Sequence, residues 1–180
     1  MTALREFKAR YLAKILSLKK HLLEKYPERA DRVNYVVDLL VGKTQNLRVF
    51  TLTDYLATLY HASKEFPEVE QLFPSEDEIK ELLKEDASGG MRLREFKAKY
   101  LARLLGLRKH LLEKYPEKRG RVEYLVETLV VKLEGLRTVT LLDYVFTVYG
   151  AAQEFKEFEA LIPGESEVEA LLSSSAGSPD

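Results

Sequence analysis

The sequence predicts an all-α protein formed by tandem duplication of a four-helix unit, with the two units packed on each other as an intramolecular pseudo-dimer. Three observations lead to this prediction. Apolar residues recur at the spacing of a helix face, a segment of about 80 residues occurs twice, and a unit of that size can bury only a modest core of its own. We expect a first unit over residues 1–86, a Gly/Ser linker over residues 87–91, a second unit over residues 92–173 and a flexible tail over residues 174–180.

The repeat needs no gap in its alignment. Residues 4–83 align with residues 93–172, and about 46 of the 80 pairs are identical. The linker ends at Met91, which stands nearly where Met1 stands in the first unit. This arrangement is typical of two reading frames joined head to tail, so we expect that a single unit once formed a dimer that the fusion made intramolecular. The alternative is two units that fold without contacting each other.

The first half of a unit reads as two helices and a loop. Residues 4–26 carry apolar side chains over about half of the helix circumference, and Pro27 ends this helix because proline disfavours helical geometry in the residue before it. Residues 28–43 follow the helical spacing too, but their β-branched valines keep a strand open as an alternative. We expect a loop over residues 44–50, extended at its end.

The second half of a unit reads as a third helix, a helical turn and a short fourth helix. Thr51 followed by Asp54 resembles a capping box and predicts the start of the third helix. Residues 68–73 form a helical turn closed by Pro74, and Ser75 with the acidic residues after it caps the last helix. The second unit repeats each of these elements.

The composition excludes sites that need cysteine and indicates the compartment. The chain has 180 residues and no cysteine, which excludes disulfides, thiol catalysis and metal sites built on thiolates. It has neither an apolar run long enough to span a bilayer nor the pattern of a signal peptide, so we expect a cytoplasmic protein. Asparagine and glutamine are scarce while Glu, Lys and Arg are abundant, which is typical of a thermostable protein.

Charge alternates in blocks along the chain, although the formal net charge is only −1. Residues 1–50 carry a net charge of +6 and residues 51–90 carry −7. Residues 91–139 carry +7 and residues 140–180 carry −7. Blocks of this kind create local potentials that steer partners whatever the total charge is. The alternation predicts head-to-tail complementarity between basic and acidic halves.

The first helix of each unit carries a basic stripe beside its apolar arc. The stripe residues, which we expect to bind a partner, are Arg10, Lys14, His21, Lys25, Lys99, Arg103, His110 and Lys114. Such a stripe fits an acidic protein surface, either on another protein or on another copy of this chain, and it also fits the phosphates of a nucleic acid. A solvated helix face, or one neutralised by the acidic half of a unit, is the alternative.

Four further basic residues fall inside the apolar arc: Lys8, Lys19, Lys97 and Arg108. We expect their aliphatic stems to cover apolar surface while the charged ends reach water. The alternative is an ion pair across a helix contact with a carboxylate such as Asp54 or Glu65, or a contact with a phosphate of a partner.

The sequence predicts no catalytic centre. The three histidines have no metal-ligand spacing, and neither a phosphate-binding loop nor a nucleophile elbow occurs. We therefore expect a non-enzymatic protein-interaction or scaffold module that binds a protein partner or itself, without a cofactor, a small-molecule substrate or a membrane. The alternatives are a small DNA- or RNA-binding protein that uses the two basic helices, and an enzyme with a site between the units.

Overall fold

The computed structural model describes residues 3–84 and 92–174, and these residues contain helices and no strand. The α-helices of the first unit are α1 (Ala3–Lys25), α2 (Ala30–Gln45), α3 (Leu52–Glu65) and α4 (Glu76–Leu83). Those of the second unit are α5 (Arg92–Lys114), α6 (Arg119–Glu134), α7 (Leu141–Glu154) and α8 (Glu165–Ser174). The predicted linker over residues 87–91 and residues 175–180 of the predicted tail lie outside the described residues.

Short 3₁₀ segments connect the α-helices. They are η1 (Pro27–Arg29), η2 (Val49–Thr51), η3 (Pro67–Leu72), η5 (Pro116–Lys118), η6 (Thr138–Thr140) and η7 (Lys156–Leu161). The all-helical prediction is confirmed, and the helix boundaries follow the sequence repeat, since α1 begins at residue 3 and α5 at residue 92.

The first helix forms as its sequence predicts. It contains neither glycine nor proline, and its buried residues recur every three or four positions: Phe7, Tyr11, Ile15, Leu18 and Leu22. The helix ends at Lys25, two residues before Pro27, which opens η1 with the fixed φ that suits a first helical turn. The buried residues thus present one long face to the rest of the unit.

The second element is a helix, as expected, and the strand alternative is wrong. It continues through Gln45, and its valines pack into the core on one face. A buried apolar face therefore outweighs the modest helix preference of the β-branched side chains. The loop after it is shorter than expected, because Arg48 is extended (φ −133°, ψ 164°) and the next residues form η2.

The predicted capping box at Thr51 does not form, whereas the cap at Ser75 is confirmed. The Thr51 Oγ1 accepts a hydrogen bond from the Arg48 backbone N–H at 3.0 Å, and Asp54 pairs with Lys43 at 2.8 Å instead of capping α3. At α4, the Ser75 Oγ accepts from the Glu78 N–H at 3.1 Å and the Glu78 carboxylate accepts from the Ser75 N–H at 3.0 Å. These reciprocal bonds satisfy two helix-end donors.

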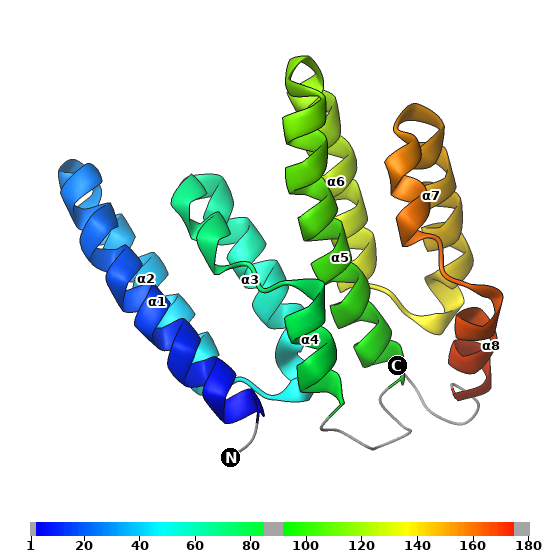
Figure 1. Ribbon diagram of the computed structural model, residues 1–180, viewed down its shortest axis with the longest axis horizontal. Helices are drawn as coiled ribbons and strands as arrows, with labels where there is room; N and C mark the ends of the chain where they lie inside the picture. The colour runs from blue at the N-terminus through cyan, green and yellow to red at the C-terminus, as the bar shows by residue number, and fades with distance from the viewer. Residues whose placement is uncertain (1–2, 85–91, 175–180) are drawn as a thin grey trace.

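The helices stand in a row, with α1 and α2 at one end and α7 and α8 at the other (Figure 1). The main contacts between the units join α3 and α4 of the first unit to α5 and α6 of the second. The two units do pack on each other, but they use different faces. A symmetric dimer would use the same face of both units, so this junction has a head-to-tail arrangement and lacks the twofold symmetry expected of a fused dimer.

One apolar core runs through both units and across the junction. Each unit contains the same aromatic contact, in which a phenylalanine of the first helix stacks on the tyrosine one turn later. The ring centroids of Phe7 and Tyr11 are 4.1 Å apart, as are those of Phe96 and Tyr100. Among the described residues, no helix combines the length and the apolar character that a membrane span requires.

Candidate protein-interaction surfaces

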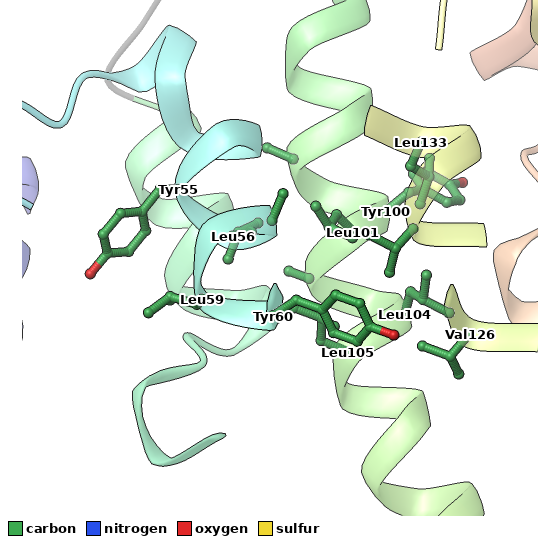
Figure 2. Packing of buried hydrophobic residues seen from close by; sticks show 14 of the residues in the cluster. Tyr55, Leu56, Leu59, Tyr60, Tyr100, Leu101, Leu104, Leu105, Val126 and Leu133 are labelled. Atoms are coloured by element: carbon green, nitrogen blue, oxygen red, sulfur yellow. The ribbon is translucent and has the colours of Figure 1, made fainter. Parts of the chain in front are cut away.

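The junction between the units is an apolar contact between α3 and α5. Figure 2 shows Leu56 and Tyr60 of α3 extending toward Leu101 and Leu105 of α5, and all four side chains are buried. Ala57, one turn before Tyr60, is only 2% exposed. The apolar area that this contact removes from water stabilises the chain by roughly 25 cal/mol for each Å².

Arg103 joins the units at the edge of this contact. Its guanidinium forms an ion pair with Glu76 at the start of α4, with a shortest distance of 2.8 Å, and it also donates to the Ala160 carbonyl at 2.9 Å. Burial alone would raise the pKa of the Glu76 carboxyl, but the hydrogen bonds and the charge of Arg103 outweigh burial and lower the pKa. Arg103 therefore holds α4, α5 and η7 together.

Arg108 forms a second ion pair across the junction, and it is only 6% exposed. Its guanidinium lies 3.0 Å from Glu70 of the first unit and 2.8 Å from Glu123 of its own unit. Burial would lower the pKa of Arg108, and the hydrogen bonds and charges of Glu123 and Glu70 raise it overall. The expectation that Arg108 reaches water is therefore wrong, and the alternative of an ion pair holds, though not with Asp54 or Glu65.

Two more polar contacts of the junction lie between α3 and α6. Lys64 pairs with Glu127, and the His61 ring lies 3.4 Å from the Glu134 carboxylate. Both pairs are exposed, so each contributes little to stability. Together with the pairs of Arg103 and Arg108, they place polar groups at the edge of the apolar contact, as in a protein–protein interface.

Most of the predicted basic stripe is paired with carboxylates of the same chain. The pairs are Arg10 with Glu78 at 2.8 Å, Lys25 with Glu68, Lys99 with Glu167 at 2.8 Å, Arg103 with Glu76, and Lys114 with Glu157 at 2.7 Å. Each carboxylate comes from the acidic half of a unit, in the segments η3, α4, η7 and α8. The alternation of charge in the sequence is thus consumed in large part inside the fold.

The other three stripe residues are exposed. Lys14 lies over the Tyr11 ring, with its Nζ 4.5 Å from the ring centroid, and His21 and His110 face outward. Lys14 and His21 border a groove of about 510 Å³ that also includes Ser17, and no carboxylate that could orient the imidazole lines it. Among the described residues, no group of acidic residues or histidines could hold a metal ion.

A tyrosine hydroxyl binds the last helix of each unit to its first helix. The Tyr11 hydroxyl donates to Glu78 at 2.9 Å, and the Tyr100 hydroxyl donates to Glu167 at 2.5 Å. Burial, together with the hydrogen bond to Glu167, raises the pKa of Tyr100 to about 12. These neutral hydroxyls act as structural donors, as suits tyrosines packed at the edge of a core.

The outer side of α7 and the preceding η6 carries an exposed apolar surface, which we call the α7 face. It consists of Val139, Leu142, Phe146 and Tyr149. Their spacing of three or four residues places them on one side of the helix. By the repeat, Phe146 and Tyr149 correspond to Ala57 and Tyr60, which are buried in the junction, whereas Phe146 is 65% exposed.

The outer side of α1 carries a second such surface, which we call the α1 face. It consists of the exposed Ala9, Ala13 and Leu16 and the half-buried Leu12. These residues are identical in type to their counterparts in α5: Ala98, Leu101, Ala102 and Leu105. All four counterparts are buried in the second unit, yet Leu16 is 56% exposed. The two ends of the row therefore expose positions that the repeat relates to the two sides of the junction, namely Phe146 and Tyr149 on α7 and Leu16 on α1.

These two faces were missed by sequence reasoning, which concentrated on charge. The signal lay in the comparison of the repeats, because Thr53 and Ala57 of the first unit become Leu142 and Phe146 in the second. A change toward larger apolar side chains away from the core stripe indicates an exposed apolar patch, and such patches mark interaction sites.

Comparisons of the chain with protein-family models, with curated proteins and with solved structures give no match. Its function must therefore be inferred from the surfaces of this chain.

Proposed function

We propose that this protein is a non-enzymatic helical interaction or scaffold module, and that the α7 face is the surface through which it binds a protein. The observation that carries this proposal is the exposure of Leu142, Phe146 and Tyr149 together on one helix. Aromatic and large aliphatic side chains that are exposed as a group are the usual anchors of a protein interface.

The origin of the molecule is part of the same proposal. The sequence identity between the repeats and the matching helix boundaries support a tandem duplication. An ancestral single unit would have bound a second unit by packing its third helix on the first helix of its neighbour. The fusion would have preserved that contact as the junction. The many ion pairs within the units support thermostability, and a chain without cysteine suits the reducing cytoplasm.

The alternative of a nucleic-acid-binding protein has less support. The phosphate-binding role would fall to the basic stripe, but Arg10, Lys25, Lys99, Arg103 and Lys114 already have carboxylate partners. Fluorescence anisotropy of labelled DNA and RNA of random sequence, titrated at two salt concentrations, separates the two functions. We expect the protein to bind these nucleic acids weakly. Tight binding whose affinity falls steeply with salt would favour the nucleic-acid-binding function.

A photo-crosslinking experiment tests the proposed surface directly. A benzoylphenylalanine at position 146 of the full chain should form covalent adducts with a protein in a cell extract on irradiation. The same group at Tyr35, which is exposed on α2, serves as the matched control and should not. No adducts at position 146, or equal adducts at both positions, would contradict the proposal.

A further inference from the structure

The junction inside the chain indicates what the α7 face can bind. Within the chain, Leu56 and Tyr60 of α3 pack on Leu101 and Leu105 of α5. The helices α1 and α7 lie at opposite ends of the row (Figure 1). Each carries exposed apolar side chains at the corresponding positions, Leu16 on α1 and Phe146 and Tyr149 on α7. A second copy of this chain therefore offers to the α7 face a surface of the type that already binds its counterpart.

We propose that the α7 face of one molecule docks on the α1 face of a second molecule, in the manner in which α3 docks on α5. This inference rests on the proposed function, because it names the partner of the same surface. The partner is a second copy of the chain, and the contact is head to tail.

The α1 face has the same residue types as the face of α5 that binds α3. Leu12 and Leu16 stand where Leu101 and Leu105 meet α3 in the junction (Figure 2). The alanines of the α1 face are also unchanged from those of α5, so the backbone of an approaching helix meets the same shape. Leu105 is 2% exposed where it has this partner, which measures how completely the contact covers the position.

Charged residues at the two ends of the row also match those of the junction. Two ion pairs of the junction have counterparts of the same sign at the two ends, namely Lys14 with Glu165 and Lys19 with Glu159. The first reproduces the pair that Arg103 forms with Glu76 at 2.8 Å. These lysines and glutamates are on the outer elements α1, η7 and α8, so docking would bring them together.

An acidic segment meets a basic segment at the junction, and the proposed contact between molecules would join segments of the same two signs. The junction joins the described residues 51–84, with a net charge of −5, to residues 92–139, with +7. The proposed contact would join residues 140–174, with −6, to residues 3–50 of the next molecule, with +6. Many of these charges are already paired within their own units, so the complementarity between the ends rests on Lys14 and Lys19 of α1 facing Glu165 and Glu159. It favours the head-to-tail encounter over contact between two like ends.

The intermolecular contact differs from the junction in ways that weaken it. Gly150 and Gln153 replace His61 and Lys64, so two polar pairs of the junction are absent. Phe146 replaces an alanine, and its ring must lie over the small side chains of the α1 face. We therefore expect reversible association.

A head-to-tail contact leaves one free α7 face and one free α1 face on every assembly. Unless the rotation between molecules closes a ring, the assembly grows as an open chain. The scaffold role would then come from the length of this chain, in which each molecule adds two units.

Sedimentation velocity of the full chain, from about 1 to 500 µM, tests the inference. The weight-average mass of the wild type should rise with concentration and should continue beyond the dimer. The single variants Leu16→Glu and Phe146→Glu each place a charge on one face only, and each should weaken association at least about thirtyfold. Both positions are exposed, so circular dichroism and thermal unfolding should remain those of the wild type. Tyr35→Glu is the matched control and should associate as the wild type does.

Mixing the two variants is the decisive step. One variant keeps an intact α7 face and the other an intact α1 face, so an equimolar mixture should form a dimer and stop there. A wild type that remains monomeric at every concentration, a Leu16→Glu variant that still associates, or a mixture that remains monomeric would each overturn the inference. A monomeric wild type whose position 146 crosslinks to a different protein would overturn this inference alone, whereas the absence of any crosslink would overturn the proposed function as well.

Discussion

Arg108 illustrates how one residue changes its role between the two units. At this position the first unit has Lys19, which is half-buried at the end of the row, and the second unit has an arginine enclosed by Glu70 and Glu123. The planar guanidinium of Arg108 bonds Glu123 through Nε and Nη2 while its Nη1 lies 3.0 Å from Glu70. A lysine, whose charge sits on one nitrogen, lacks this fixed fork. The substitution therefore follows from the position of the residue in the junction.

Replacement of Arg108 should destabilise the protein much more than replacement of Lys19. Arg108→Met leaves Glu70 and Glu123 facing each other at the junction, and we expect a loss of about 2–3 kcal/mol, below the cost of breaking a fully buried pair because both carboxylates are partly exposed. Lys19→Met should change stability by less than about 0.5 kcal/mol. Urea unfolding of both variants at low protein concentration measures the difference, and equal losses would contradict the assignment.

The Glu157 carboxylate should make stability depend on pH. The hydrogen bond from Lys114 is the main cause that lowers the pKa of Glu157 from 4.5 to about 2. Because the pKa is lower in the folded protein, the stabilisation is complete above about pH 4.5 and is lost as the pH falls toward 2. Thermal unfolding between about pH 6 and about 2 should show a falling Tm, and the fall should be smaller in Glu157→Gln. An unchanged slope in the variant would contradict this origin.

At the scale of the elements, the helices were predictable and the contacts between them were not. The apolar spacing of α1 and the cap at Ser75 are local patterns, and the structure confirms both. The pairing of Arg108 depends on where α4 and η3 meet α5, which no local pattern specifies. The pseudo-dimer was inferred from the repeat and the small size of a unit, and neither specifies which faces meet.

The same leucine in the two copies of the first helix should therefore have unequal importance. Leu105→Ala removes apolar volume from the buried junction and should cost about 2–5 kcal/mol. Leu16→Ala removes the same atoms from an exposed position, and in the monomer it should cost less than about 0.5 kcal/mol. Denaturant unfolding at low protein concentration compares them, and a cost for Leu16→Ala close to that of Leu105→Ala would show that α1 is covered in the monomer.

At the scale of the molecule, the sequence shows the charge blocks, but only the fold shows which charges form ion pairs with each other. Many of the basic residues are neutralised within the units, as the pairs of Arg10 and Lys99 show, while the ends of the row retain exposed apolar surface. The molecule thus resembles a short segment of a repeating array, with one internal junction and two ends that match each other.

Site-specific disulfide formation tests this claim most directly, because the chain has no cysteine of its own. Leu16→Cys and Phe146→Cys are prepared separately and then mixed under mild oxidation, with Tyr35→Cys as the exposed control. Head-to-tail docking predicts that the mixed disulfide between positions 16 and 146 forms faster than either homodimer and faster than any product with the control. Homodimers that form as fast as the mixed product would contradict the head-to-tail contact between molecules.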